Sequence, residues 1–454
     1  MNFSALAYND PEEMIFGRAL HPVRCGFDLV IGAGETLPEI NFTLPTMPVA
    51  RGNLSEVLKQ YQEMVTGILS RLVILDVPGA VIEFEHTPQM TDDVEIGARI
   101  TEQAKNLMQE YYNKHGLKSA LRVTICDIRD KDRPPRMRSG DATKQVLEAF
   151  RMNAQKGADL LSIESTGGKE VSDRAIMEAD VPGLLLALGI LAPRDMHFFW
   201  KEICRIAKDE NVIPAGDTAC AFANTAMVLA DRKYIPNVLA VVIRAMSSVR
   251  SLVAYEEGAI GPSKDCAYEG PVIKAITGYP ISMEGKSSAC AHFSHVGNIA
   301  SAVCDLWSNE SVQNVKLLSG YAPEAFTEIL AYDCRLMNEA LAAGDELILK
   351  KLMTDSDEFK SVHALIISPN SSYQIAKAIL EEESDFQRTR RAGLVACELL
   401  REAVTSEKLR LPEREIQYLN RIEADLNRYS DEDMVLSHAM PSYPDVALLS
   451  EYGL

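Results

Sequence analysis

Apolar runs typical of buried strands alternate along the chain with segments of helical periodicity. Because these runs are apolar at nearly every position, both faces of the sheet that they form should be covered, as in parallel sheets flanked by helices. The expected strands lie at 72–86 (a loop followed by a strand), 121–127, 158–165, 212–217, 238–245, 280–284 and 315–320, with one more near residue 266. The expected helices between them lie at 55–71, 97–113, 141–156, 195–209 and 220–232.

This alternation predicts an α/β fold of the (β/α)8 TIM-barrel class, which needs roughly 250 residues. We assign the barrel to residues 51–322, and an open doubly wound sheet is the alternative. Residues 1–50 are irregular and contain several prolines and glycines, so we expect them to form an N-terminal extension. The strand pattern fades after residue 322, and residues 323–454 are expected to form a helical C-terminal layer.

Charge and hydropathy exclude some classes of function. The chain has 46 Lys and Arg against 65 Asp and Glu, a formal net charge of -19. Such a surface repels nucleic acid and anionic membranes, so we expect neither as a partner. The N-terminus has no signal-peptide pattern, and the longest apolar run, 181–193, is too short to span a bilayer. We therefore expect a cytoplasmic protein.

Three residues with metal-ligating side chains stand at or just after the ends of expected strands. Glu164 ends one strand, Cys220 opens the helix that follows another, and Cys266 follows a loop rich in Gly, Pro and Ser. The C-terminal strand ends of a barrel gather at one mouth. One carboxylate and two thiolates with a fourth position open to substrate are typical of a catalytic zinc site. The alternative is two buried cysteines and an ion-paired glutamate. Cys290 competes with Cys266 on chemistry alone.

Other motifs carry less information. The segment 278–288 is similar to a phosphate-binding loop, but Pro280 stands where a glycine is required. His292 and His295 lack the carboxylate of an HExxH zinc motif. No GxGxxG follows an expected strand, and no GxSxG is present. The sequence therefore does not favour nucleotide binding or a serine hydrolase.

Two long segments resemble a known family. They are 214-PAGDTACAFANTAMVLA-230 and 256-EEGAIGPSKDCAYEGPVIKAITGYPISMEGKSSACAH-292, and they resemble the methanol–corrinoid methyltransferases, the zinc subunits of the methanol-activating system of methanogens and acetogenic bacteria. The resemblance implies a zinc-containing (β/α)8 barrel that acts with a separate corrinoid protein. The family's zinc ligands carry over to Glu164 in IEST, Cys220 in DTAC and Cys266 in KDCAYEG, with one Zn²⁺ per chain. Cys290 then becomes a filler residue.

The resemblance implies transfer of the methyl group of methanol to the Co(I) corrinoid of the partner, with zinc as Lewis acid on the methanol oxygen. Two thiolates and a carboxylate give the zinc site a formal charge of -1, which weakens the Lewis acid, so we expect a proton donor near the leaving oxygen. Asp217 is the candidate, and a helix-capping role is the alternative. Other hypotheses are a zinc barrel methyltransferase with another methyl donor or a thiol acceptor, and a non-catalytic assembly subunit.

We expect the corrinoid to come from the partner and not from this chain. A DxHxxG pattern would indicate a corrinoid carrier, and the nearest match, 195-DMHFFW-200 around His197, has Trp200 in place of the glycine. The irregular segment 258–264 is expected to shape the rim of the mouth on which the partner docks. We also expect a homo-oligomer.

Overall fold

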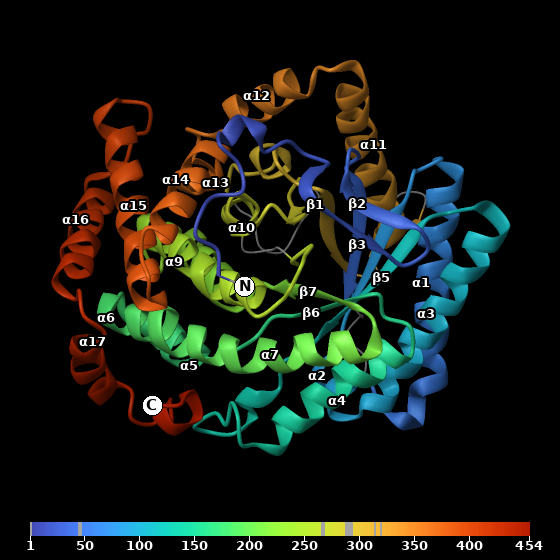
Figure 1. The fold of residues 1–454 in the computed structure, drawn as a ribbon, viewed down its shortest axis with the longest axis horizontal. Coiled ribbons are helices and arrows are strands. Elements are labelled where there is room, and N and C mark those ends of the chain that lie inside the picture. Colours follow the sequence, from blue (N-terminus) through green and yellow to red (C-terminus); the bar gives the residue numbers. More distant parts are fainter. Residues whose placement is uncertain (1, 44–47, 265–267, 287–293, 313–314, 318–319) are drawn as a thin grey trace.

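A rolled parallel sheet forms the centre of the molecule (Figure 1). The computed structural model describes residues 2–43, 48–264, 268–286, 294–312, 315–317 and 320–454. Seven strands pair in the order β7-β6-β5-β4-β3-β9-β8, and every neighbouring pair is parallel. They are β3 (Leu37–Thr43), β4 (Ala80–Glu85), β5 (Ser119–Ile125), β6 (Leu160–Ile163), β7 (Ile213–Asp217), β8 (Ser282–Glu284) and β9 (Leu306–Val312).

The eighth position of the barrel is filled by an irregular segment and not by a regular strand. The backbone N–H of Ile260 donates to the carbonyl of Pro214 in β7, at 3.0 Å. Ser263 forms a parallel bridge with Ile281, next to β8. Residues 258–264 therefore join the two edges of the sheet and close the barrel. Residues 261–264 are buried in the barrel wall, and the expected role of this segment at the rim stays a prediction.

Helices cover the outside of the sheet, as a parallel sheet requires. The predicted (β/α)8 class is confirmed, and the open doubly wound sheet is not. The helices that follow successive strand positions are α1 (Leu54–Ile74), α3 (Val94–His115), α4 (Asp141–Gln155), α7 (Ala192–Glu210), α9 (Asn237–Glu256), α10 (Gly270–Thr277) and α11 (Ala322–Ala343). Shorter helices within the connections are α2 (Pro88–Asp92), α5 (Lys169–Glu178), α6 (Val181–Leu184) and α8 (Thr225–Asp231).

Two expected strands are wrong. Residues 238–245 belong to the helix α9, which is buried from Val238 to Tyr255. Because α9 is enclosed on all sides, its residues 238–243 are apolar at every position and show no helical period to distinguish them from a buried strand. Within the described residues, α9 is also the one helix long and apolar enough to span a membrane, and it lies wholly inside the structure.

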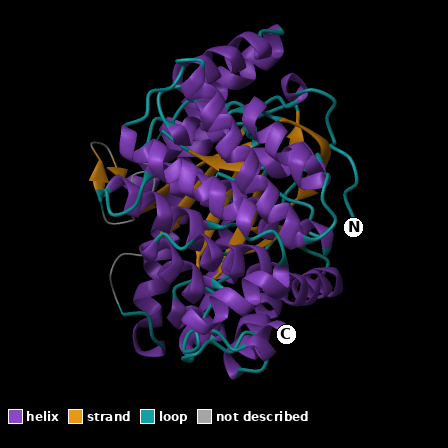
Figure 2. Ribbon diagram, turned by 90° about the vertical axis from the view of Figure 1, so that its left-hand side faces the viewer, coloured by secondary structure: helices purple, strands orange, loops and turns teal. Residues whose placement is uncertain are grey.

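The expected strand at 315–320 gives the small antiparallel pair β10 (Lys316–Leu317) and β11 (Gly320–Tyr321) outside the barrel. Figure 2 shows this pair at the edge of the molecule away from the N-terminus.

The barrel begins inside the expected N-terminal extension. The strand β3 pairs with β4 on one side and β9 on the other, so it lies in the interior of the sheet. The boundary expected at residue 51 therefore falls after the first strand. Before β3, a hairpin of β1 (Arg18–Cys25) and β2 (Leu29–Ala33) lies against the barrel. The last barrel helix, α11, which follows β9, begins at Ala322, where the helical C-terminal region was expected to start.

The side chains that point into the barrel change character from one end to the other. At the N-terminal ends of the strands they are apolar, and together with Cys25, Leu29 and Ile31 of the hairpin they form a separate buried cluster. The barrel members of this cluster are Leu37, Val81, Ala120, Leu160, Ala215 and Leu306. Two and four residues further along, the same faces carry polar side chains, because successive inward positions on a strand are two residues apart. These include Glu39, Asn41, Glu83, Glu85, Arg122, Thr124, Ser162 and Ser282.

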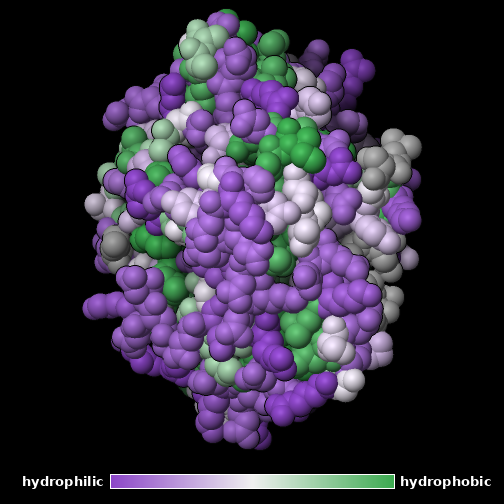
Figure 3. All heavy atoms as spheres, turned by 90° about the vertical axis from the view of Figure 1, so that its right-hand side faces the viewer, coloured by the Kyte–Doolittle hydropathy of each residue, from purple (hydrophilic) through white to green (hydrophobic). Residues whose placement is uncertain are grey.

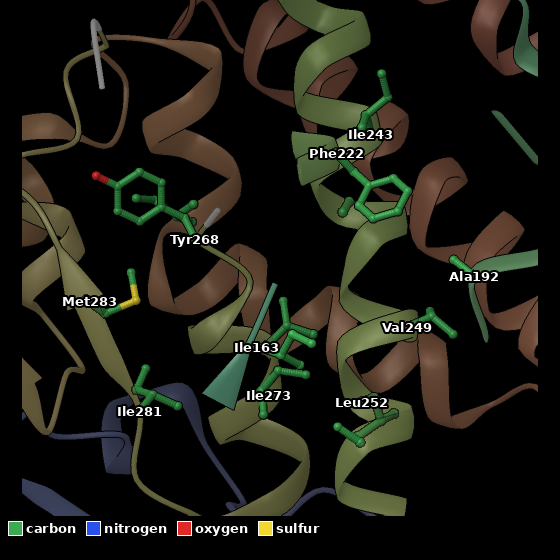
Figure 4. Packing of buried hydrophobic residues seen from close by; sticks show 14 of the residues in the cluster. Ile163, Ala192, Phe222, Ile243, Val249, Leu252, Tyr268, Ile273, Ile281 and Met283 are labelled. Carbon is green, nitrogen blue, oxygen red and sulfur yellow. The ribbon is translucent and has the colours of Figure 1, made fainter. Parts of the chain in front are cut away.

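The C-terminal helices cover α9 and the barrel side next to it. They are α12 (Glu346–Asp357), α13 (Val362–Ile367), α14 (Pro369–Leu380), α15 (Asp385–Thr405), α16 (Glu413–Arg428) and α17 (Glu432–Ala439). Of these, α15 has the most extensive contact with α9. Figure 4 shows α9 in the middle of this core, with Ile163 and Ile273 to one side and Ala192 to the other. The outer surface on the side of α1 and α3 is mostly hydrophilic, with small apolar patches (Figure 3).

Candidate functional site

A buried arginine forms the floor of the polar half of the barrel. Arg122 on β5 is fully buried, and its Nε donates to Oε1 of Glu39 at 2.6 Å. Its Nη1 donates to the Ser162 hydroxyl at 2.8 Å and to the carbonyl of Pro262 at 2.7 Å. Burial raises the pKa of the Glu39 carboxyl, and the charge of Arg122 opposes that rise. The floor thus ties β3, β5, β6 and the irregular eighth segment together.

A lysine stands above this floor among three carboxylates. The Nζ of Lys264 lies 2.9 Å from Oε1 of Glu164 and 3.9 Å from Oε1 of Glu83, and it also donates to Glu85. The lysine side chain is 4% exposed, whereas those of Glu85 and Glu164 are 22% and 30% exposed. Asn41 donates to Glu85 at 3.2 Å. The lysine is therefore inside the barrel, and two of its carboxylate partners reach toward solvent.

Sequence reasoning missed this lysine cluster, although a signal was present. Glu83 and Glu85 alternate with apolar residues in 80-AVIEFE-85, so they must share the inward face of a buried strand. Charges in such positions are costly without partners. The same argument that selected Glu164 applies to both of them.

Glu164 and Cys220 meet at the same edge of the sheet. Glu164 directly follows β6, and Cys220 lies three residues after the end of β7. These strands are neighbours in parallel register, with Ile163 opposite Asp217. Cys220 is partly exposed, and the side-chain amide of Asn224 donates to its Sγ at 2.9 Å. Cys266 and Cys290 lie outside the described residues, as does His292. The described chain before Cys266 stops at Lys264, which contacts Glu164.

Asp217 points away from the barrel interior. Leu161 pairs with Pro214 but Ser162 pairs with Gly216, so β7 carries one extra residue, a β-bulge. The bulge turns Asp217 to the helix-covered face of the sheet, where it is fully buried. Its carboxylate accepts hydrogen bonds from Trp200 Nε1 at 2.9 Å, Arg250 Nη2 at 3.0 Å and the Ser165 backbone N–H at 3.2 Å. These contacts fit a structural role. The role of proton donor stays a prediction that none of them supports.

Most of the other described cysteines are buried thiols. Burial raises the pKa of Cys25, Cys204 and Cys397 to about 12, and it also raises the pKa of Cys304 and Cys334 well above the ordinary value of a thiol. Cys126 directly follows β5 and lies near enough to Glu164 for their charges to interact. Burial, followed by the Asp127 carboxylate, raises the pKa of Cys126 to about 12, which disfavours its thiolate. The thiolate is the form that binds metal, and the surroundings of Cys126 disfavour it.

A second group of potential metal ligands lies outside the barrel. His197, Glu256 and Asp385 place ligand atoms within 4.8 Å of one another. The His197 ring contacts Glu257 through Nδ1 at 2.7 Å and Asp385 through Nε2 at 3.0 Å, and Arg388 pairs with Glu256 at 2.9 Å. The carboxylates of Asp385 and Glu256 are therefore already paired with basic side chains of the chain, His197 and Arg388. This group ties α7, α9 and α15 together.

The residues at the mouth fit a zinc ion in their chemistry. A carboxylate and a sulfur side chain, both partly exposed, follow neighbouring strands, and zinc favours oxygen, nitrogen and sulfur ligands of this kind. A buried ammonium fixes the orientation of the carboxylate through Oε1, and an amide donates to the sulfur. Partners of this type commonly orient metal ligands. The third ligand expected from the sequence, Cys266, belongs to the undescribed residues.

Comparison with known proteins agrees with this architecture. The family model of the methanol-cobalamin methyltransferase B subunit matches residues 1–451. The chain is 40% identical over 446 residues to the methanol–corrinoid protein co-methyltransferase of Methanosarcina barkeri (strain Fusaro), covering 97% of this chain and 96% of that protein. It is 38% identical to a chain in the crystal structure of the methanol:cobalamin methyltransferase complex MtaBC from Methanosarcina barkeri, with a TM-score of 0.95 and coverage of 100% and 99%. The resemblance expected from two segments is confirmed over nearly the full length: the chain belongs to the methanol-cobalamin methyltransferase B subunit family.

Proposed function

We propose that this protein transfers the methyl group of methanol to the Co(I) corrinoid of a partner protein, with one zinc ion held by Glu164, Cys220 and Cys266. The observation that supports the proposal is that Glu164 directly follows β6 and Cys220 lies three residues after β7, two neighbouring parallel strands. The relatives support the substrate, since one is named for methanol and a corrinoid protein and another was solved as a methanol:cobalamin methyltransferase complex.

Zinc bound at these residues would supply Lewis acidity, polarising the C–O bond of methanol and stabilising the departing oxygen. The chain's own residues then have three tasks: to hold the ligands in place, to provide a proton and to control access. Holding the ligands in place is the task of Lys264 and Asn224, which contact Glu164 and Cys220. Positioning of this kind contributes by keeping the reacting groups in a productive geometry.

The proton for the leaving oxygen comes from the Lys264–Glu85 pair in this proposal, and not from Asp217. Lys264 Nζ contacts both Glu85 and Glu164, so it lies beside the reacting centre. Asp217 is turned toward α7 and α9, where Trp200 and Arg250 bind its carboxylate. Glu85 is partly exposed and can exchange protons with solvent after each turnover.

Access to this centre is from one end of the barrel. The apolar layer and the β1–β2 hairpin close the N-terminal end. Methanol and the corrinoid must then enter at the C-terminal mouth, where the partner protein would cover the site and exclude water. The corrinoid stays with the partner in this proposal, and His197, the centre of the sequence closest to a corrinoid motif, is bonded to Glu257 and Asp385.

The decisive experiment measures methyl transfer with the purified chain and an isolated corrinoid protein. Methylation of the Co(I) corrinoid by methanol should require zinc, stop when a chelator removes it and resume when zinc is returned. A parallel assay offers methylcobalamin and a thiol, which is the reaction of a thiol-methylating zinc barrel. Faster thiol methylation, or full methanol activity in a chain shown to lack zinc, would reject the proposal. A chain that binds the corrinoid protein but catalyses neither reaction would be an assembly subunit.

A further inference from the structure

One side chain of the buried helix α9 reaches both segments that follow β6 and β7. Arg250 is 1% exposed, and its Nη1 donates to the carbonyl of Thr218 at 2.9 Å. Its Nη2 donates to the hydroxyl of Ser165 and to Asp217, the latter at 3.0 Å. Ser165 is the neighbour of Glu164, and Thr218 stands two residues before Cys220. One guanidinium therefore bridges the two segments that carry the described candidate ligands.

The next residue of α9 extends this bridge. The Ser251 hydroxyl donates to Oε1 of Glu269 at 2.9 Å, and the same oxygen accepts the backbone N–H of Ala219 at 2.6 Å. Glu269 is 3% exposed and lies three residues after Cys266 in the sequence. Ala219 directly precedes Cys220. Two consecutive residues of α9 thus connect segments adjoining all three candidate ligands.

Arg250 is also fixed in place by apolar packing. Its guanidinium carbon lies 5.0 Å from the centre of the Phe222 ring, two residues after Cys220. Val249 and Leu252 flank it on α9 and belong to the main core (Figure 4). Because core packing locks the helix, the guanidinium cannot follow a loop that moves. The geometry therefore restrains the loops relative to one another, which is the property that a preorganised metal site needs.

We propose that Arg250 is a positioning residue that sets the separation of Glu164 and Cys220 before zinc arrives. This inference rests on the proposed zinc site and adds to it the residue that holds the ligand-bearing segments in register. Removing the guanidinium takes away its bonds to Ser165, Asp217 and Thr218 and leaves the Ser165 N–H bond to Asp217, so the link between the two segments is loosened. Zinc must then order these segments as it binds, and its affinity falls.

A second buried ion pair provides a matched control. Lys274 on α10 is fully buried and pairs with Asp305 at 2.9 Å, and it also donates to the carbonyls of Ile15 and Val303. Lys274 resembles Arg250 in its burial and in its bonding. Each is bonded to one carboxylate and to two neutral oxygens, which are two carbonyls for Lys274 and a carbonyl and a hydroxyl for Arg250. However, its partners adjoin none of the candidate ligands. Lys274→Met should lower thermal stability as Arg250→Met does, without a specific effect on zinc.

The test compares Arg250→Met, Arg250→Lys and Lys274→Met with the wild-type chain. Zinc affinity is measured by competition with a chelator, and the cobalt(II)-substituted proteins are examined by absorption spectroscopy. We expect Arg250→Met to weaken zinc binding about 10–100-fold, the usual effect of losing a partner that orients metal ligands. Arg250→Lys, which can keep part of the bonding, should fall between Arg250→Met and wild type. Thiolate-to-cobalt absorption should persist while the d–d bands change, because the cysteines remain and the ligand geometry does not.

Two results would overturn the inference. Wild-type zinc affinity and an unchanged cobalt spectrum in folded Arg250→Lys and Arg250→Met would show that the bridge does not position the ligands. An equal loss of zinc affinity in Lys274→Met would show that the effect is one of general stability. A wild-type chain that binds no zinc would instead reject the proposed function itself. If Arg250→Met does not fold, Arg250→Lys decides the matter, because it retains a buried cation beside Asp217.

Discussion

The two ends of the barrel interior use the same strands for opposite purposes. At the N-terminal end the inward side chains are aliphatic, and a hairpin seals them from water. At the C-terminal end the next inward positions carry Glu39, Arg122 and Glu83, and then Glu85, Lys264 and Glu164. Both ends are closely packed. The apolar side chains of the N-terminal end need no specific partners, whereas the polar side chains of the C-terminal end are held by specific hydrogen bonds and ion pairs. We infer that stability is concentrated at the sealed end and chemistry at the open end, and each half can be tested separately.

The largest effect is expected at the open end from loss of a metal ligand. Cys220→Ala should abolish stoichiometric zinc binding and lower methanol activity by more than the roughly 10–100-fold that loss of an outer partner costs. Metal analysis and the methyl-transfer assay measure both quantities. Cys126→Ala, at the same mouth, is the control and should keep its zinc, because burial raises the pKa of the Cys126 thiol to about 12 and disfavours the thiolate. Tight zinc in the Cys220 variant would move the ligand assignment elsewhere.

The next largest effect is expected where the two halves meet. Arg122→Met removes the cation that is bonded to the buried Glu39 carboxylate and should cost about 3–5 kcal/mol of unfolding free energy. Urea unfolding measures this cost. Arg24→Met removes an arginine that pairs with Asp28 across side chains 71% and 60% exposed, so it should change stability by about 0–1 kcal/mol. Similar losses in both variants would contradict a structural role for the buried floor.

The sealed end should respond in stability and not in chemistry. Leu29→Ala removes a side chain that is 2% exposed from the apolar layer and should cost about 2–5 kcal/mol. Zinc content and the rate of methyl transfer should stay at wild-type values below the unfolding transition. Leu20→Ala, on the same hairpin but 51% exposed, should change neither. A specific loss of activity in the Leu29 variant would mean that the two ends are coupled.

A smaller effect, on the rate and on zinc affinity, is expected from the lysine of the open end. Lys264→Met should lower the rate of methyl transfer about 10-fold, at the low end of the range for partners of metal ligands. Zinc should remain bound, because its ligands are intact, while the affinity measured by chelator competition decreases. Glu85→Gln should reproduce the loss of rate with less change in affinity, since it keeps the shape of the pair. An unchanged rate in both variants would remove the pair from the proton path.

The smallest effect is expected outside the barrel, at His197. Hydrogen bonds to Asp385 and then Glu257 raise the pKa of His197 to about 9 against an ordinary value of 6.5, with burial acting in the opposite direction. A raised pKa means that this histidine stabilises the fold fully below pH 6.5 and loses that contribution as pH rises through about 9. The difference in melting temperature between wild type and His197→Gln should therefore shrink from pH 6 to pH 10. A difference that grows over this range would contradict the assignment. The ring is 42% exposed, so the difference should be small.

The sequence predicts the barrel class and misplaces several of its parts for physical reasons. Five of the expected strands correspond to β4 to β8, because their apolar runs end in glycine or polar residues that are visible in the sequence. The strand β3 was missed because it lies in a stretch of the chain with several prolines and glycines, which resembles a loop, although Glu39 and Asn41 alternate with apolar residues as in a strand. The helix α9 was mistaken for a strand because a helix buried on all sides loses its period.

At the candidate site too, some features could be predicted from the sequence and others could not. Glu164 and Cys220 could be placed at one mouth from strand ends alone, since that depends on topology. The direction of Asp217 could not, because it depends on a bulge at Gly216, where φ is 141°. Lys264 bonds to Glu164, 100 residues away in the sequence, and Arg250 bonds to Ser165, 85 residues away. Pairings over such distances leave no local pattern in a single sequence.

The burial of α9 also has a consequence for how the chain is made. This helix ends at Glu256, but α15, which covers it, begins only at Asp385. At a synthesis rate of about 5–20 residues per second, the uncovered helix waits on the order of ten seconds for its cover. During that time its apolar face is exposed on a nascent chain whose strands have mostly been synthesised. A fragment ending at residue 322 would remain permanently in that state. The C-terminal helices thus complete the folding of the barrel and do not form an independent addition to it.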